Sequence, residues 1–255
     1  MKYRYENFGG IVASEDPPFL AFVDQDYMRS LNLEDSPLWE TPNPEVGLLS
    51  SPLEVHIALT NRCSNGCPHC YMDSMSEDKE ELSTKQFKQA LKILADMKVF
   101  HVALGGGEAL ERPDLFEIAA YARQIGLVPN LTLSGSGITP KTAGKMQDFG
   151  QVNLSVDGVG DLSSVFRGKD LFKTADRAID LLIRAGVPTG INCVLGRKNY
   201  PGLKDLFAYA KTKGVNEIEI LRFKPAGRAV SSYGKHACTH DQNRELVPML
   251  ADLSK

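Results

Sequence analysis

From Glu54 onward the sequence alternates six times between a short apolar segment and a longer amphipathic one, and this alternation limits the possible folds more than any other feature. Short segments that are rich in branched and aliphatic residues and bounded by turn residues are typical of strands. Strands that alternate with helices form parallel sheets with right-handed connections. The predicted strands are Val55–Leu59, Phe100–Leu104, Val128–Leu133, Gln151–Val156, Thr189–Leu195 and Glu217–Leu221.

Six strand–helix units are too few for a closed eightfold barrel. The chain of 255 residues therefore suits an α/β fold of one of two kinds, an incomplete (β/α)6 barrel of the TIM type or a doubly wound sheet. Start and stop signals such as Ser83 and Gly214 mark several helices between the strands. The predicted helices run from Ser83 to Met97, from Pro113 to Gly126, onward from Thr139-Pro140, from Asp170 to Ala185, from Pro201 to Lys213 and from Gln242 to Leu253.

The first fifty residues follow a different pattern. The segments Tyr3–Tyr5, Gly9–Val12 and Phe19–Val23 predict a small β-hairpin, and prolines 37, 42 and 44 follow in a linker-like stretch. We therefore expect an N-terminal extension over residues 1–50, packed on the barrel or presenting an edge strand. A core barrel over 51–230 and a C-terminal helix over 231–255 complete the expected organisation.

Composition and charge narrow the function classes. A formal net charge of −3 gives no reason to expect nucleic acid or an anionic membrane as partner. The N-terminus carries charges where a secretory signal would be apolar, and runs such as Leu181–Ile183 are too short to span a bilayer. We therefore expect a cytoplasmic protein. Thiols stay reduced there, which favours metal or catalytic roles for the cysteines over disulfides.

Three of the five cysteines, Cys63, Cys67 and Cys70, lie within one short loop-like run from Asn61 to Tyr71. Closely spaced thiolates commonly hold Fe–S clusters, and a cubic cluster held by three cysteines keeps one iron open for a reactant. Structural zinc is the alternative, with His69 as the fourth ligand. His69 adjoins Cys70, however, and two adjacent residues rarely reach one tetrahedral ion.

Polar motifs follow or end the predicted strands, one after another along the chain. The carboxyl ends of parallel strands meet at one edge, where barrel enzymes and open α/β sheets build their sites. We therefore expect these motifs to gather around one site. They are the cysteine loop, Gly105-Gly106-Gly107-Glu108, Ser134-Gly135-Ser136-Gly137, Ser155-Val156-Asp157-Gly158, Asn192-Cys193 and Arg222.

Each motif also has a simpler interpretation. The three glycines before Glu108 can form a tight turn, or they can let a ligand amino group approach the carboxylate. Arg167 can be a surface cation or a bidentate partner for a ligand carboxylate. Ser155 and Asp157 can form a turn or hold a hydroxyl or ribose.

The two remaining cysteines carry weaker signals. Cys193 is expected to be a small buried hydrophobic residue in a strand. Cys238 lies in a polar run, which is compatible with an exposed thiol, a hydrogen-atom donor or no role.

The Cx3Cx2C spacing of Cys63, Cys67 and Cys70 after the first strand resembles the signature of the radical S-adenosylmethionine (radical SAM) superfamily. Gly106-Gly107-Glu108 is similar to that family's motif after the second strand, and the resemblance covers roughly residues 53–225. It implies that the cysteines hold a [4Fe–4S] cluster whose open iron is chelated by S-adenosylmethionine. One electron then gives methionine and a 5′-deoxyadenosyl radical, which abstracts a hydrogen atom from the substrate.

The resemblance also implies roles for individual residues. Gly106, Gly107 and Glu108 would contact the methionine amino group, and Arg167 would pair with the methionine carboxylate. The other implied contacts are Ser155 and Asp157 with the ribose or carboxylate region, Leu221 and His69 with adenine, and Ser134 at a position where the family often has asparagine.

The run from Leu221 to Arg228 is similar to superfamily members that modify ribosomally made peptides (RiPP maturases) and carry a SPASM-type C-terminal extension. The resemblance implies a precursor-peptide substrate that is crosslinked, epimerised or oxidised, with a flavodoxin- or ferredoxin-type electron donor. The N-terminal hairpin could pair with a peptide strand. We expect the chain to be a fragment, with auxiliary clusters only if it continues beyond residue 255. A small-molecule cofactor precursor is the alternative substrate, and a non-enzymatic zinc protein is the third hypothesis.

Overall fold

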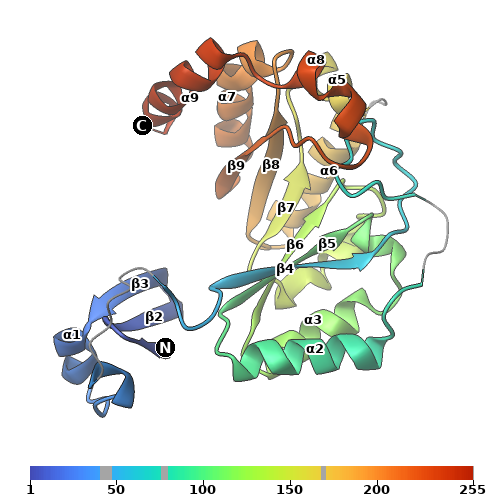
Figure 1. Ribbon diagram of the computed structural model, residues 1–255. Coiled ribbons are helices and arrows are strands. Elements are labelled where there is room, and N and C mark those ends of the chain that lie inside the picture. Colours follow the sequence, from blue (N-terminus) through green and yellow to red (C-terminus); the bar gives the residue numbers. More distant parts are fainter. Residues whose placement is uncertain (41–47, 76–79, 168–170, 255) are drawn as a thin grey trace.

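The computed structural model describes residues 1–40, 48–75, 80–167 and 171–254; Pro42, Pro44 and Asp170 lie outside these ranges. Its main sheet has six parallel strands in the order β4-β5-β6-β7-β8-β9 (Figure 1). A doubly wound sheet would reverse its order at a switch point. The strictly sequential order is that of an incomplete (β/α)6 barrel, so this prediction is confirmed. The strands are β4 (Glu54–Thr60), β5 (His101–Gly106), β6 (Val128–Leu133), β7 (Val152–Ser155), β8 (Thr189–Leu195) and β9 (Glu217–Arg222).

The two faces of the sheet differ in chemistry. Alternate residues such as Leu104, Leu154 and Ile191 are fully buried in one apolar core shared with the helices. The intervening positions on the inner face carry polar side chains such as Asn192 and Glu219. The helices on the outer side are α2 (Thr84–Asp96), α3 (Leu115–Gln124), α4 (Pro140–Ala143), α6 (Leu171–Arg184) and α7 (Leu203–Lys213). The short helix α5 (Asp161–Arg167) packs through Phe166 against Phe223, just beyond β9, and α8 (Tyr233–His236) and α9 (His240–Leu253) follow the sheet.

Most predicted helix ends are correct because the signals are local. Ser83 caps α2 through a capping box with Gln86. Gly214 ends α7 in the left-handed conformation with φ 74°. Two predicted starts were too early. A 3-10 turn over Ala109–Glu111 precedes α3, which begins after Pro113, and another over Tyr200–Gly202 contains Pro201, so α7 begins at Leu203.

α9 begins before its predicted start, and the reason is again a capping box. Thr239 caps the helix and Gln242 is its third residue, so the first turn includes His240 and Asp241. No helix within the described ranges is long and apolar enough to cross a bilayer.

The N-terminal extension contains the expected hairpin and a third strand. The strands β1 (Lys2–Glu6), β2 (Gly9–Glu15) and β3 (Pro18–Asp24) form an antiparallel sheet that α1 (Gln25–Ser30) follows. An apolar cluster that includes Ile11 and Phe100 links it to the barrel, together with the hydrogen bond from Arg4 Nη1 to Lys98 O and the ion pair of Glu15 with Arg123. Because Phe100 immediately precedes β5, this small sheet lies at the amino ends of the barrel strands (Figure 1).

Candidate active site at the carboxyl ends of the strands

The loop after β4 carries three free, half-buried thiols, those of Cys63, Cys67 and Cys70. Two backbone hydrogen bonds close its neck: Cys63 N donates to Met75 O at 3.1 Å, and Met75 N donates to Asn61 O at 3.0 Å. A turn in which Cys70 N donates to Cys67 O at 3.1 Å brings the last two cysteines together. The backbone therefore forms a closed loop that carries all three cysteines at the carboxyl end of β4.

The glycine motif at the end of β5 packs directly against the start of this loop. Gly107 N donates to Thr60 O at 2.7 Å, and Glu108 N donates to Arg62 O at 2.8 Å. A Cβ on Gly107 would lie 2.0 Å from Arg62 O, and Gly106 has φ 116° with Thr60 O 2.5 Å from its would-be Cβ. The glycines are thus required for backbone packing. Their contact with a ligand amino group stays a prediction.

Glu108 is a buried carboxylate, and one of its two oxygens has no hydrogen-bond partner. It is 2% exposed. Its Oε2 accepts from Ser134 N at 3.1 Å, from the Ser134 hydroxyl and from Asn65 Nδ2 at 3.4 Å. Its Oε1 is buried without a partner. Burial raises the pKa of this carboxyl, although the Ser134 hydrogen bonds oppose the shift. An unpaired buried acceptor is costly, and a ligand amino group would satisfy it.

Ser134 has a role that the sequence did not reveal. Because both its backbone N–H and its hydroxyl donate to one oxygen of Glu108, it fixes the direction of the other oxygen. It therefore positions Glu108; direct contact with a ligand stays a prediction.

Arg167 and Asp157 form a buried ion pair, with Nε 2.7 Å from Oδ2 and Nη2 donating to Oδ1 at 3.1 Å. Val194 N also donates to Asp157 Oδ1, at 2.8 Å. Burial opposes the charge of Arg167, but Asp157 more than compensates and raises its pKa. Arg167 is therefore buried, which excludes the surface-cation interpretation, and it already has a carboxylate partner in the protein. Its pairing with a methionine carboxylate stays a prediction.

His69 lies inside an aromatic cluster. Its Nδ1 donates to Phe166 O at 2.6 Å, and its ring is 6.3 Å from that of Phe223 at 30°. His236 completes the cluster, 5.4 Å from Phe166. Burial lowers the pKa of His69, so its imidazole is neutral near pH 7 although Asp157 Oδ2 lies 3.6 Å away. Stacking of His69 on adenine stays a prediction.

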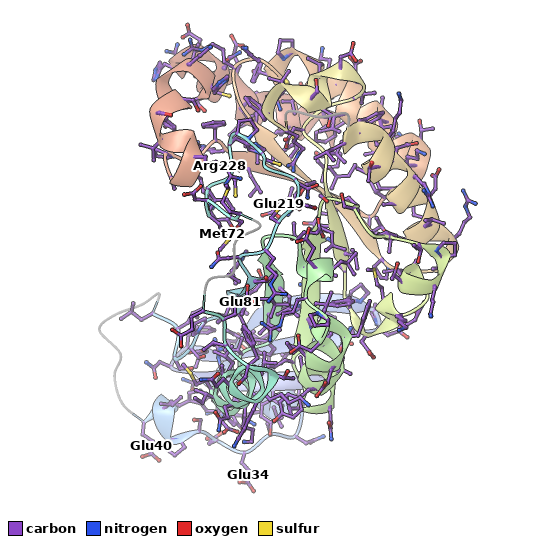
Figure 2. All side chains as sticks on the ribbon, turned by 90° about the vertical axis from the view of Figure 1, so that its right-hand side faces the viewer. Glu34, Glu40, Met72, Glu81, Glu219 and Arg228 are labelled. Atoms are coloured by element: carbon purple, nitrogen blue, oxygen red, sulfur yellow. The ribbon has the colours of Figure 1, made fainter. Side chains whose placement is uncertain are left out.

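Arg228, which follows the last strand β9, holds the cysteine loop that follows the first strand β4, and no sequence motif predicted this contact. Its Nε donates to Cys67 O at 2.9 Å and its backbone N to Cys70 O at 3.0 Å. Its Nη1 donates to Ser74 O at 2.8 Å. The preceding Gly227 has φ 57°, and a Cβ there would lie 2.4 Å from Cys70 O. Figure 2 labels Arg228 beside Met72 of the loop.

Two acidic side chains that were not among the predicted site residues accept hydrogen bonds from the start of the cysteine loop. Glu81 Oε1 accepts from the Thr60 hydroxyl at 2.6 Å and from Asn61 N at 2.8 Å (Figure 2). Glu111 Oε1 accepts from Ser64 N at 3.0 Å and from its hydroxyl at 2.7 Å. No sequence motif marked either residue, because the hydrogen-bond partners of each lie in a distant segment.

The remaining predicted residues fall into two groups. Ser155 ends β7 and Leu221 lies in β9, both half-buried and near the carboxyl ends of their strands. Cys193 is fully buried in the apolar core, as expected. Cys238 packs near Leu195, Leu203 and α9. Burial raises the pKa of the Cys238 thiol, which is half-buried and not fully exposed.

The three free thiols of one loop are the ligand set that a protein offers a [4Fe–4S] cluster with one open iron. Within residues 1–40, 48–75, 80–167 and 171–254, no group of three His, Cys, Asp or Glu side chains converges as the ligands of one ion would. A cluster binds its three thiolates on three separate irons, so it needs nearby sulfurs but no common point. Burial raises the pKa of Cys67, and metal binding would displace that proton. The unpaired Glu108 Oε1 fits the amino group of a bound cofactor.

The chain belongs to the radical SAM superfamily, whose family model matches residues 57–210. Among curated proteins it is similar to the mycofactocin maturase MftC of Mycolicibacterium smegmatis, with 34% identity over 206 residues, 79% of this chain and 52% of that protein. The pre-heme d1 synthase of Dinoroseobacter shibae is 30% identical over 75% of this chain and 48% of that protein. The chain thus spans about half the length of these relatives.

Among solved structures, Streptococcus suis SuiB bound to S-adenosylmethionine matches with TM-score 0.74 and 16% identity, over 98% of this chain and 69% of that one. SuiB bound to its precursor peptide SuiA matches with TM-score 0.73 and 15% identity, over 98% of this chain and 68% of that one. These likenesses confirm the fold. The cofactors of the superfamily are a [4Fe–4S] cluster and S-adenosylmethionine, as the resemblance implied.

Proposed function

We propose that this chain is the core of an enzyme that reductively cleaves S-adenosylmethionine and abstracts a hydrogen atom from a ribosomally made precursor peptide. The observation that carries the proposal is the unpaired, buried Glu108 Oε1 beside the loop of three free thiols. A [4Fe–4S] cluster on Cys63, Cys67 and Cys70 would supply the electron that breaks the carbon–sulfur bond. A flavodoxin- or ferredoxin-type protein would in turn supply that electron.

The residues of this chain would bind and orient S-adenosylmethionine. Glu108 Oε1 would accept from its amino group, and Ser134 would hold Glu108 in that orientation. Ser155 is a suitable partner for a ribose hydroxyl, because it has no side-chain partner among the described residues. Leu221, two positions beyond the inner-face residue Glu219 on β9, would pack against adenine.

The peptide substrate is supported by the similarity to a mycofactocin maturase and by the shared fold with SuiB, a structure of which holds its precursor peptide. β3 offers a second observation, because among the described residues it is an edge strand, paired only with β2, on which an extended peptide could add a strand. β3 lies at the amino ends of the barrel strands. A peptide bound there would therefore reach the cysteine loop with a segment many residues away.

A small-molecule substrate is the second candidate, supported by 30% identity to a pre-heme d1 synthase. The two candidates differ in the shape and charge of the substrate. The inner face of the barrel bears on this choice, because Glu217 and Glu219 would repel a ligand that carries several carboxylates.

The decisive experiment is anaerobic reconstitution with iron and sulfide, followed by assay for 5′-deoxyadenosine with dithionite as reductant. We expect a brown protein that forms 5′-deoxyadenosine, and loss of both iron and product in Cys67→Ala. Cys193→Ala is the matched control, because it removes a thiol from the apolar core and should keep iron and turnover. Unchanged turnover in Cys67→Ala would disprove the proposal.

The substrate class needs a separate test. The peptide encoded by a short reading frame beside the gene should change mass when it is incubated with the reconstituted protein and S-adenosylmethionine. If no such peptide changes mass while a haem precursor is converted, the second candidate is correct.

A further inference from the structure

We propose that Asn192 and Glu219 form a substrate-binding site on the inner face of the barrel, one that selects a hydrogen-bond donor of the substrate: an amine, an amide N–H or a hydroxyl. This inference rests on the proposed function, since it concerns what binds beside the cofactor. It gives Asn192 a role and makes Glu219 a direct contact of the substrate.

The strand register places these side chains in one row. Ser155 of β7 pairs with Asn192 of β8, and Asn192 pairs with Glu219 of β9. Their neighbours Ile191 and Ile220 pack in the apolar core on the outer face. Because side chains alternate along a strand, the row itself faces the inside of the barrel.

Asn192 is the strongest indication of a ligand. It is 8% exposed, yet its Oδ1 has no hydrogen-bond partner. Its Nδ2 donates to the Thr132 hydroxyl of β6 at 3.4 Å, which ties the amide group to the inner face. A buried carbonyl oxygen without a partner destabilises the fold, and such groups in native proteins usually serve a ligand or a water.

Glu219 adds a second acceptor in the adjacent position of the row. It is half-buried on β9, an edge strand of the sheet. Figure 2 labels its side chain at the middle of the barrel. Burial and the neighbouring Glu217 and Glu54 raise the pKa of Glu219, while His56 opposes the shift.

An amide oxygen and a carboxylate are both acceptors, so their shared ligand must be a donor. An ammonium group gains an additional electrostatic attraction from Glu219, and a hydroxyl or amide N–H is accepted equally well by Asn192 Oδ1. A carboxylate ligand would lie against Glu219 and leave Asn192 unpaired. The row therefore favours a peptide-like substrate over a polycarboxylate.

The first test uses three small probes of equal chain length, C-deuterated butylamine, butan-1-ol and butyrate, with reconstituted protein, S-adenosylmethionine and dithionite. One dithionite electron cleaves the carbon–sulfur bond to give methionine. The other fragment is a 5′-deoxyadenosyl radical, and a probe seated against Asn192 would lose a deuterium atom from a C–D bond to this radical, which gives monodeuterated 5′-deoxyadenosine. The probe radical then takes an electron from dithionite and a proton from water. Mass spectrometry of 5′-deoxyadenosine measures the transfer.

We expect at least fivefold more deuterium from butylamine and butan-1-ol than from butyrate. Asn192→Leu should reduce transfer from both donors, and Glu219→Lys should reverse the preference in favour of butyrate. Glu245→Gln, on the exposed side of α9, is the matched control and should leave the preference unchanged. Equal transfer from all three probes, or a preference that survives both variants, would overturn the inference.

A second measurement does not depend on turnover. Saturation-transfer NMR with the same three probes reports binding to the protein whether or not 5′-deoxyadenosine is formed. If the donors bind in preference to butyrate and Glu219→Lys reverses this, the row binds donors even where the proposed reaction fails. If 5′-deoxyadenosine is formed but the probes saturate equally, the inference is wrong while the proposed function stands. Circular dichroism spectra of each variant identify any that misfold.

Discussion

Two buried glutamates, one at each end of the barrel, show how the same side chain serves stability in one place and a site in another. Glu6, in the small N-terminal sheet, is 1% exposed, and Glu108, beside the cysteine loop, is 2% exposed. Both oxygens of Glu6 have partners: Arg4 Nε at 2.6 Å and Ser50 Oγ at 3.1 Å on Oε1, and Ser50 N at 2.8 Å on Oε2. Glu108 keeps one oxygen unpaired. Burial alone therefore does not distinguish a structural glutamate from a site glutamate. Whether each carboxylate oxygen has a hydrogen-bond partner does distinguish them.

The largest expected effect on stability is at Glu6, whose two oxygens both have hydrogen-bond partners. Glu6→Ala leaves the buried Arg4 guanidinium without its carboxylate, so we expect a loss of about 3 kcal/mol in the free energy of unfolding, measured in urea. Glu15→Ala is the control, because that side chain is half exposed and its surface ion pairs with Lys2 and Arg123 should each contribute less than about 1 kcal/mol. Equal losses in the two variants would contradict the comparison.

Arg228 tests the carboxyl end of the barrel, where Glu108 keeps an unpaired oxygen beside the cysteine loop. Arg228→Met removes three side-chain hydrogen bonds to residues 67, 73 and 74 of the loop, so we expect a loss of about 2 kcal/mol in stability. Faster alkylation of Cys67 and Cys70 by iodoacetamide in the metal-free protein should accompany it. Arg228→Lys keeps the charge, so its stability and its alkylation rate should lie between those of the unaltered protein and those of Arg228→Met. Alkylation rates that do not change would show that Arg228 does not order the loop.

Ser134→Ala tests how Glu108 is held. The hydroxyl donation is lost while the backbone donation remains. We expect S-adenosylmethionine to bind about fivefold more weakly, which corresponds to about 1 kcal/mol, by equilibrium dialysis of the reconstituted protein. Ser164→Ala, in the exposed part of α5, should bind as the unaltered protein does.

Glu108→Gln should give the smallest change in stability, and a favourable one that depends on pH. Burial raises the pKa of Glu108, so the folded state keeps its proton over a range where the unfolded chain, with a carboxyl pKa of 4.5, has lost it. The stability of the unaltered protein therefore falls as pH rises through that range. The melting temperatures should coincide below pH 4.5 and separate above it, with the variant higher. An advantage that is constant with pH, or one also seen in the exposed Glu117→Gln, would contradict this assignment.

The sequence predicted what depends on neighbouring residues and missed what depends on distant ones. All six strands were found because one face of each must pack against helices, and Ser83 was found because its capping partner Gln86 lies three residues away. Arg228 was missed because its partner Cys67 lies 161 residues earlier.

Side-chain orientation was the other limit. The short helix α5, which was not expected, turns Arg167 inward onto Asp157 and makes a protein ion pair where a ligand contact was predicted. Asn192 was expected near the site as one of the polar residues of the strands, but without a role of its own. Its importance comes from an empty hydrogen-bonding position, which no local pattern encodes.

The close packing of Gly107 on Arg62 O has a consequence for engineering. The thiol loop, residues 60–75, is held by two other segments: Gly107 and Glu108 contact its start, and Gly227 and Arg228 contact its second half. Transplanting the segment 60–75 alone into another barrel would leave its carbonyls exposed and its shape undefined. A functional graft must carry all three segments together, and a library that randomises one of them should recover working sequences only when the glycines are kept.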